Sequence, residues 1–316
     1  TVADMMPLLD ENRTLVKWGL VVLNKTKRLG LKELFNIAGL STIASGDQSA
    51  EQKFLFPSNM AVQQSKRPPK PINSYEIGFI IAPRLNAAGR MNHANAAFQL
   101  LTAKDQLEAK KLAQELNQAN QQRQSSTNQI LAQAEQQATE QIKKDKKVLV
   151  AISPVLLTAI GQQPMSQTSQ FVSAEPPAVL RPDSPGKNTL PSNLSNNLNQ
   201  EPIKNEYWPV SLIGLAAGKI SDKYHRPCFL ITKTIGGYFS GSGRSIKKFN
   251  IIEAISHCQD ILNKFGGHPG ACGFTLQKEQ DILTFTEKIN NIADQILSAQ
   301  DLKPEITIDA ELSLAD

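Results

Sequence analysis

The chain has little of what identifies several common protein classes. Its 316 residues include three cysteines, Cys228, Cys258 and Cys272, which are too few and too scattered for a disulfide framework or a zinc site. We therefore expect reduced, buried thiols and a cytoplasmic location. No apolar run approaches the ~20 residues that span a bilayer, so we expect no membrane association.

The histidines give no sign of a metal site. His93, His225 and His257 show no metal-ligand spacing among themselves or with the cysteines, so we interpret them as structural or exposed. The chain also begins at Thr1 without an initiator methionine or the basic and apolar regions of a signal peptide. We expect it to be a piece of a larger protein.

The charge balance is modestly basic. The chain has 34 Lys and Arg residues against 29 Asp and Glu residues, a net charge of +5, and its isoelectric point is near 9.0. Such an excess favours an anionic partner such as nucleic acid. The length predicts two domains, or one domain with additions.

The first half of the sequence has mainly helical patterns. Apolar residues at helical spacing predict helices over 12–40, broken near Gly30. The polar and proline-rich segment 41–71 indicates a flexible insertion. A short apolar run, 77–81, follows. Residues 94–143 contain no proline or glycine and have a thin apolar stripe, which predicts a long helix able to bridge two domains.

The second half alternates strands and helices around another polar insertion. Segment 153–205 has eight prolines and many polar residues, so we expect it to be disordered. The other expected elements are strand 148–152, helix 212–224, strand 228–232, a turn at Gly236 and Gly237, strand 238–243, helix 251–265, strand 271–276 and helix 280–299. Alternating elements of this kind predict an α/β domain.

A glycine-rich motif at 241–245 is a candidate phosphate site. Glycines at alternate positions let a backbone approach a ligand closely, while Ser242 and Arg244 supply donors that suit a phosphate. The alternative is a glycine-rich turn at the end of a strand. About twenty residues later come Gly266, Gly267 and His268, which we expect to form a turn at the mouth of another strand.

His268 has two interpretations. Its ring suits stacking on a base or a hydrogen bond to a phosphate, or it simply satisfies the end of a strand. A third set of polar residues, Arg84, Asn86 and Arg90, follows the apolar run. Because six residues separate the two arginines, they do not share one helix face, but an irregular loop would let them converge on an anion. The alternative is an ordinary polar loop.

Together these segments resemble the RecJ-like single-stranded-DNA-specific exonucleases of the DHH phosphoesterase superfamily. The matching motifs lie at 1–8, 11–13, 81–91, 212–218, 226–227, 241–245, 265–268 and 308–312. The likeness as a whole extends over nearly the whole chain outside the two insertions. One departure is Pro209, which follows Trp208 where many relatives have histidine. A proline cannot donate or accept as an imidazole does.

The resemblance implies an α/β fold and a domain plan. We expect the C-terminal end of a DHH phosphoesterase domain, a flexible insertion, a connecting segment with the long helix, a DHH-associated substrate-binding domain that contains the disordered insertion 153–205, and the start of a linker toward an OB domain. The expected limits are 1–40, 41–71, 72–147, 148–300 and 301–316, respectively.

The resemblance also implies site residues. Asp4, unremarkable by itself, matches the family's last metal-ligand aspartate, which would make it a catalytic residue of a two-metal site for Mn²⁺ or Mg²⁺. No Asp-His-His triplet occurs in the sequence. The implied substrate-binding residues are Arg84, Asn86, Arg90, Ser242, Gly243, Arg244, Ser245, Gly266, Gly267 and His268, with Ser242 and Arg244 on the 5′-phosphate side.

The implied activity is hydrolysis of phosphodiester bonds in single-stranded DNA from the 5′ end, in DNA repair and recombination. We expect a monomer that is inactive without the rest of the metal ligands. The implied partners are single-stranded DNA, a single-strand-binding protein and a helicase. Two alternatives stay open: a phosphodiesterase of oligonucleotides or cyclic dinucleotides from the same superfamily, and a non-catalytic nucleic-acid-binding module.

Overall fold

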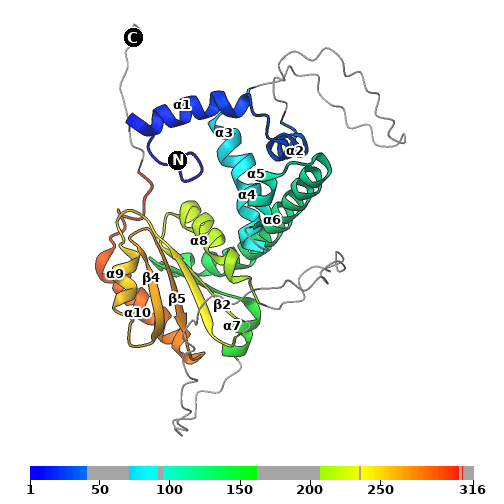
Figure 1. Cartoon of the computed structure of the whole chain (residues 1–316). Helices are drawn as coiled ribbons and strands as arrows, with labels where there is room; N and C mark the ends of the chain where they lie inside the picture. Colours follow the sequence, from blue (N-terminus) through cyan, green and yellow to red (C-terminus); the bar gives the residue numbers. More distant parts are fainter. Residues whose placement is uncertain (41–70, 92–94, 162–206, 235, 306–307, 309–316) are drawn as a thin grey trace, which may run out of the picture. The chain divides into compact units, whose positions relative to one another are not determined.

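The computed structural model describes residues 1–40, 71–91, 95–161, 207–234, 236–305 and 308 (Figure 1). The chain divides into two compact units. Unit 1 comprises Thr1–Gln136 and Pro209–Lys223, and unit 2 comprises Gln137–Trp208 and Tyr224–Asp316. The long helix α6 (Gln106–Lys143) begins in unit 1 and ends in unit 2.

Unit 1 is helical. Its elements besides α6 are α1 (Asp10–Asn24), α2 (Leu29–Ile37), α3 (Ser74–Glu76), the π-helical turn η1 (Ile77–Ile81), α4 (Ala82–Met91), α5 (Asn95–Thr102) and α8 (Val210–Tyr224), whose last residue is counted in unit 2. Its core combines apolar residues from five of these elements and the segment before α3: Leu34, Phe35, Ile72, Ile81, Ala88, Leu100, Leu112, Ala113 and Leu116. The apolar run 77–81 forms the middle of a helical segment that begins with α3 and continues directly into α4.

Two helix boundaries in unit 1 differ from the expected ones. The break between the first two helices lies at 25–28, and Gly30 is inside α2. A Cβ atom on Gly30 would collide with the backbone carbonyl of Leu100, so this glycine allows the close approach of α2 and α5. The predicted helix 94–143 is interrupted at 103–105, where the Asp105 carboxylate accepts the Glu108 backbone N–H at 2.9 Å and so caps α6. Residues 41–70 lie outside the described residues.

Unit 2 contains a five-stranded mixed sheet. Its strands are β1 (Leu149–Ile152), β2 (Cys228–Lys233), β3 (Phe239–Arg244), β4 (Leu262–His268) and β5 (Ala271–Leu276). They are ordered β1-β2-β3-β5-β4; β1 and β2 are parallel and the other pairs are antiparallel. Helices α7 (Pro154–Gly161), α9 (Ile251–Ser256) and α10 (Gln280–Ile296) complete the unit (Figure 1). The predicted α/β class is confirmed.

One face of the sheet carries the core of unit 2. Phe274 stacks on Phe285 with ring centroids 4.5 Å apart, and Phe229 meets both rings edge-on. Leu156 of α7 joins the same cluster. The expectation of buried thiols is confirmed, because all three cysteines are free and buried. Burial raises the pKa of the Cys258 thiol to about 11 and that of Cys272 to about 12.

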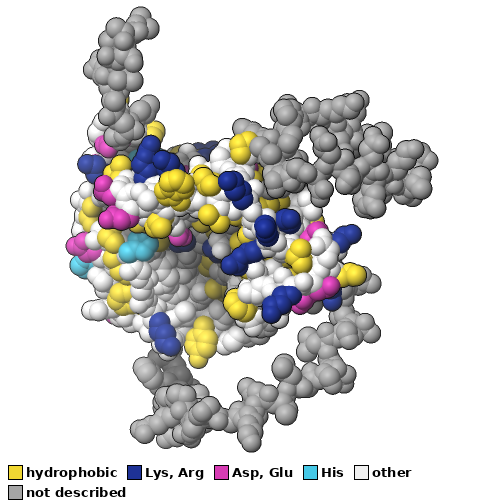
Figure 2. Space-filling model, turned by 45° about the horizontal axis from the view of Figure 1, so that its top comes forward, with side chains coloured by type: hydrophobic (Ala, Val, Ile, Leu, Met, Phe, Trp, Pro, Cys, Tyr) yellow, Lys and Arg dark blue, Asp and Glu magenta, His cyan; other side chains and the backbone are white. Residues whose placement is uncertain are grey.

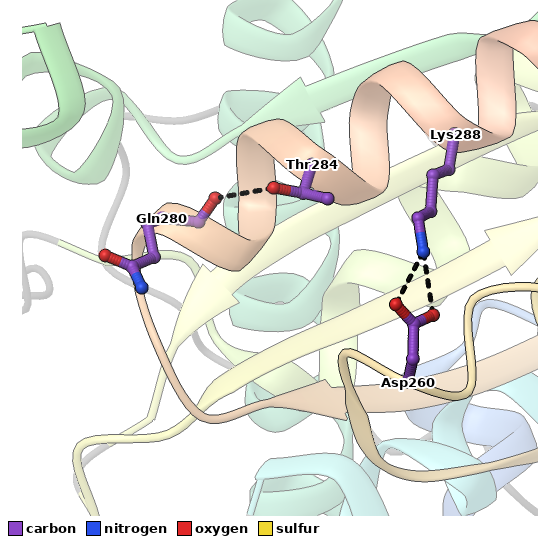
Figure 3. Close-up of polar contacts among 4 residues, drawn as sticks. All are labelled: Asp260, Gln280, Thr284 and Lys288. Carbon is purple, nitrogen blue, oxygen red and sulfur yellow. Dashed lines mark hydrogen bonds and ion pairs between the residues drawn. The ribbon is translucent and has the colours of Figure 1, made fainter. Parts of the chain in front are cut away.

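An ion pair fixes the segment that precedes β4. Lys288, on α10, donates to the two carboxylate oxygens of Asp260 at 2.6 and 2.8 Å (Figure 3). At the start of the same helix the Thr284 hydroxyl donates to the Gln280 carbonyl at 3.5 Å (Figure 3). Both charged side chains of the ion pair are partly exposed, so its contribution to stability is small, of the order of ~0.2–1 kcal/mol.

The predicted helix 251–265 is wrong beyond Ser256. Helix α9 ends there, and the chain enters edge strand β4 at Leu262. The cross-strand pairing of Phe265 with Phe274 and of Gly266 with Gly273 belongs to this strand. Glycine is a poor helix former, and pairing with β5 decides the conformation of a segment whose local apolar pattern favours a helix.

The prediction of disorder over 153–205 is wrong for its first residues. Pro154 begins α7, where its missing N–H would have no helical partner in any case, and Leu156 is buried in the core. A short apolar segment therefore orders by packing on the sheet although its flanking composition predicts disorder. Residues 162–206 lie outside the described residues.

Two glutamines of α6 cover the free edge of β1. The Gln141 side-chain amide donates to the Val150 carbonyl at 2.8 Å and accepts the Val150 N–H at 2.9 Å. Gln137, one turn earlier, bonds the carbonyl and N–H of Ile152 at 2.6 and 3.0 Å. The two side chains thus take the place of a neighbouring strand, which satisfies the edge and blocks pairing with another chain.

We expect Gln141→Met to expose this edge. The methionine has a similar length but no amide, so both Val150 backbone groups lose their partner, at a cost of about 1–3 kcal/mol for each group that stays buried. Hydrogen exchange of the Val150 amide should speed up by at least tenfold, while Gln136→Met, at an exposed neighbouring position, should leave it unchanged. Equal exchange rates in both variants would contradict the edge role of Gln141.

Candidate nucleic-acid interface

The motif 241–245 lies mostly on β3, whose side chains alternate between two faces of the sheet. Phe239, Gly241 and Gly243 are buried toward the core, and Ser242 and Arg244 are half-buried on the opposite face. This alternation follows from the period of two in a strand. The two residues predicted to bind phosphate therefore lie on the face without the aromatic core.

Gly241 and Gly243 of this motif are needed for packing on the core face of the sheet. A Cβ atom on Gly241 would collide with the ring of Phe274. One on Gly243 would lie 2.6–2.8 Å from Ile251, Cys272 and Phe229. Packing therefore requires glycine at both positions, so these two residues cannot be attributed to close approach of a ligand. The predicted contact of Gly243 with substrate stays a prediction, and it concerns the backbone alone.

A different pair of glycines leaves the polar face open. Ser242 is paired with Gly273 of β5, which is paired with Gly266 of β4. A Cβ atom on Gly266 would meet nothing within 4 Å, and one on Gly273 would meet only the Gly241 carbonyl oxygen at 3.9 Å. Across β3, β5 and β4, this row of paired residues thus has one side chain, the Ser242 hydroxyl, followed by the bare backbone of Gly273 and Gly266. We call this surface the glycine floor.

Arg244 and His268 border the glycine floor on the next row. Arg244 is paired with Ala271, which is paired with His268. Neighbouring strands lie ~4.8 Å apart, so the backbones of Arg244 and His268 are separated by about 10 Å. A guanidinium and an imidazole therefore lie on the two sides of the small Ala271 side chain, next to the floor.

Hydrogen bonds orient the polar groups. The Arg244 guanidinium donates to the Ser242 hydroxyl at 3.3 Å and to the Gly243 carbonyl at 2.8 Å. His268 Nδ1 accepts the Gly270 N–H at 3.2 Å, so the neutral ring carries its proton on Nε2. Ser245 is engaged elsewhere, because its hydroxyl donates to the Phe249 carbonyl at 2.6 Å. Ser242, Arg244 and His268 thus form one polar set, with Ser245 fixing the following turn.

The predicted residues of unit 1 lie on helix α4, not on an irregular loop. Arg84 donates to Asn117 of α6 at 3.0 Å and to the Ile80 carbonyl at 2.7 Å, and burial lowers its pKa. Arg90 is exposed and donates to the Ser211 carbonyl at 3.0 Å. Six residues in a helix turn the side chains about 120° apart, so the two arginines serve different neighbours. Asn86 is exposed.

Asp4 does not belong to a group of potential metal ligands in the described part of the chain. Its side chain is 82% exposed. No group of three His, Cys, Asp or Glu residues that could hold a metal occurs among the described residues. A carboxylate is the right kind of ligand for Mn²⁺ or Mg²⁺, but one carboxylate does not form a two-metal site. The role of Asp4 stays a prediction.

An apolar groove in unit 1 does not suit an anion. It has a volume of about 460 Å³ and lies between α1 and α2, with Leu15, Trp18, Val22 and Leu31 in its lining.

Figure 2 shows hydrophobic side chains (yellow) among Lys and Arg side chains (dark blue) on one face of the molecule. Within the described ranges, no helix combines the length and apolar composition that crossing a bilayer requires.

Comparison with known proteins gives the family context. Residues 200–295 match the model of the DHHA1 domain. The chain is 30% identical over 317 residues to the single-stranded-DNA-specific exonuclease RecJ of Bacillus subtilis, which covers 100% of this chain and 30% of that protein. It is 25% identical over 320 residues to the Salmonella typhimurium protein of the same name, covering 100% and 42%. The chain thus spans less than half the length of these relatives.

Solved structures share the fold. The crystal structure of RecJ from Thermus thermophilus in complex with Mg²⁺ matches with a TM-score of 0.61 and 23% identity, over 93% of this chain and 33% of that one. A crystal structure of exonuclease RecJ bound to manganese matches with a TM-score of 0.60 and 23% identity, over 96% and 56%. The expected resemblance to a portion of RecJ is confirmed for the whole chain.

Sequence reasoning misses two features of these surfaces. Gly273 does not stand out, because a lone glycine in a strand becomes informative only when the register shows which face it opens. Arg123 does not stand out either, because it lies in a long polar helix. Its spacing of three residues from Asn120 places these two side chains on one side of α6 and is the available signal.

The two glycines at the end of β4 should respond differently to substitution. A Cβ atom on Gly267 would collide with the Ala271 carbonyl, and this residue has a φ of +153°. We expect Gly267→Ala to destabilise unit 2 by about 1–3 kcal/mol. Gly266→Ala, whose Cβ meets open space, should change stability by less than about 0.5 kcal/mol. Urea unfolding of unit 2 would measure both, and equal losses would contradict this packing.

Proposed function

We propose that this RecJ-like chain, which carries a DHHA1 domain, is the strand-holding portion of an exonuclease that hydrolyses phosphodiester bonds in single-stranded DNA. The observation that carries the proposal is the glycine floor of unit 2, bordered by Ser242, Arg244 and His268. An open floor on a sheet lets a nucleotide backbone approach the protein main chain. The relatives' name, single-stranded-DNA-specific exonuclease, supports this choice of polymer.

In this proposal Arg244 binds the 5′-terminal phosphate. A guanidinium keeps its charge at every working pH and presents paired N–H donors that match two phosphate oxygens. The Ser242 hydroxyl, which accepts a hydrogen bond from Arg244, would contact the same phosphate. His268 would donate from Nε2 to a phosphate oxygen across the floor, or stack on a base, since its Nδ1 is occupied by Gly270.

The proposed substrate contacts in unit 1 are Arg90, Asn86 and Arg84. Arg90 and Asn86 are exposed on α4 and suit neighbouring phosphate and sugar groups. Arg84 is engaged with Asn117 and the Ile80 carbonyl, so its main contribution is to hold α4 on α6. A substrate contact of Arg84 would come from its remaining donors, because a guanidinium has five N–H groups.

The proposed hydrolysis needs a divalent metal site. The solved structures that share this fold are described as complexes with Mg²⁺ and with manganese, which supports Mn²⁺ or Mg²⁺ as the cofactor. Asp4 would supply one carboxylate ligand. Because the described residues do not form a metal-binding set, we derive no chemical step from them, and we propose that this chain alone is inactive.

The proposal extends to the direction of cleavage, the cellular role and the partners. We propose cleavage from the 5′ end, since Arg244 and Ser242 would hold a terminal 5′-phosphate. Such an activity suits DNA repair and recombination in the cytoplasm, where buried, unpaired cysteines stay reduced. A monomer that receives its strand from a single-strand-binding protein or a helicase completes the proposal.

The phosphate contact is tested with a fluorescent oligonucleotide made with and without a 5′-phosphate. We expect this chain to bind the phosphorylated strand about tenfold more tightly, equivalent to about 1.4 kcal/mol, and Arg244→Ala to abolish the difference. Fluorescence anisotropy at fixed salt concentration measures all four dissociation constants. Strand affinity without any 5′-phosphate preference would remove the assignment of Ser242 and Arg244.

A charge-matched control separates this contact from general attraction. Lys278 is exposed and follows the other end of β5, away from the glycine floor, so Lys278→Ala removes one charge from the same unit. It should keep the phosphate preference. If both variants weaken binding of both strands equally, in a salt-dependent way, the attraction is nonspecific and the proposed site is wrong.

A further inference from the structure

Arg123 is a half-buried arginine of α6 whose guanidinium is incompletely satisfied. One terminal nitrogen donates to the side chain of Asn120 at 2.9 Å, and Asn120 is itself only 2% exposed. The Arg123 Nε lies buried without a hydrogen-bond partner. Leaving a buried donor of a permanently charged group unpaired destabilises the fold, so Arg123 would be stabilised by an acceptor.

The neighbouring charge that acts on Arg123 has the same sign. Burial lowers the pKa of Arg123, and the positive charge of Arg90 lowers it further. Within the described part of unit 1, no ion pair joins either guanidinium to a carboxylate. The two arginines lie on α4 and α6, which the hydrogen bond from Arg84 to Asn117 joins. Both groups are permanently charged, and the described residues supply no anion between them.

Arg84 provides the contrast. It also lies between α4 and α6, but two of its nitrogens bond a side-chain oxygen and a backbone carbonyl, and no like charge contributes to its pKa shift. Arg90 makes one bond, to Ser211, and Arg123 makes one, to Asn120. Arg84 thus has two of its nitrogens engaged and no like charge acting on it, whereas Arg90 and Arg123 make one bond each and have an unbalanced charge.

We propose that Arg90 and Arg123 together form a binding site for one phosphate group in unit 1. The pair fits a phosphate, because two guanidiniums supply forked donors to several oxygens and its negative charge removes their repulsion. Arg90 is exposed and gives access, while Arg123 is half-buried and holds the deeper side. The buried Asn120 keeps Arg123 in place.

The chemistry of this site is that of a phosphate monoester or diester. It is carried by contacts within unit 1, so it stands apart from the glycine floor of unit 2. Where the ligand is a nucleic acid strand, the site rests on the proposed function and adds a second phosphate contact to it. Where the ligand is free phosphate, the site is independent of the proposed function. The test therefore has one arm for each source.

The first arm uses inorganic phosphate and thermal unfolding. All proteins carry Arg244→Ala, which removes the proposed site in unit 2. The reference protein is Arg244→Ala itself, and its phosphate increment is the rise in Tm in phosphate compared with chloride at equal ionic strength. We expect this increment to be about 2–4 °C larger than that of the protein that also carries Arg123→Gln. Arg90→Gln, at an exposed position where folding is not at risk, should lose the same increment. Lys111→Gln, an exposed charge on α6, should keep it.

The two readings of Arg123 give opposite results in chloride. A merely structural arginine would lower the Tm when replaced and leave the phosphate increment unchanged. Relief of repulsion predicts that Arg123→Gln has an equal or higher Tm in chloride and a smaller phosphate increment. Equal phosphate increments in Arg123→Gln, Arg90→Gln and Lys111→Gln would overturn the proposal.

The second arm uses an unphosphorylated single-stranded oligonucleotide with Arg244 intact. We expect Arg123→Gln to reduce the slope of log K against log salt by about 0.7, the contribution of one phosphate on a single strand, and Lys111→Gln to leave the slope unchanged. A changed phosphate increment with an unchanged slope supports a free-phosphate site and withdraws the strand contact. Failure of the 5′-phosphate test in unit 2 affects neither result.

Discussion

The alternation of side chains along β3 is the constraint on which the candidate interface depends. Gly241 and Gly243 have no room for a Cβ because the rings of Phe274 and Phe229 and the Ile251 side chain occupy that space. The aromatic core can therefore approach the sheet closely on one face. The intervening residues, Ser242 and Arg244, are directed to the other face by the same geometry. Core packing and the exposure of Ser242 and Arg244 on the opposite face are two consequences of one strand register.

Helix α6 places polar side chains for two different purposes along its length. In unit 1, Asn117 bonds Arg84 and Asn120 bonds Arg123, so amide groups orient cationic ones. In unit 2, Gln137 and Gln141 bond the backbone of β1. A helix rich in Gln and Asn looks nonspecific in sequence, yet its amides both donate and accept, which suits guanidinium groups and a strand edge equally.

The sequence predicts the parts of this fold that local patterns determine. The alternating strands, the long helix and the small-residue helix α8 all occur close to the expected ranges. The errors lie where distant residues decide. β4 forms because β5 pairs with it, although its segment continues an apolar helical pattern, and α7 orders because Leu156 finds the core. A local pattern carries no information on such partners.

The candidate site shows the same limit at the level of single residues. Two of its polar members, Arg244 and His268, can be found from the sequence because few residue types bind phosphate. The purpose of each glycine cannot, because it depends on which face of the sheet the residue opens. The register assigns Gly241 to the core and Gly273, beside it, to the open floor. A shift of one residue in this pairing would exchange the two faces and bury Arg244, so strand register, more than motif content, determines whether this sheet can present a phosphate site.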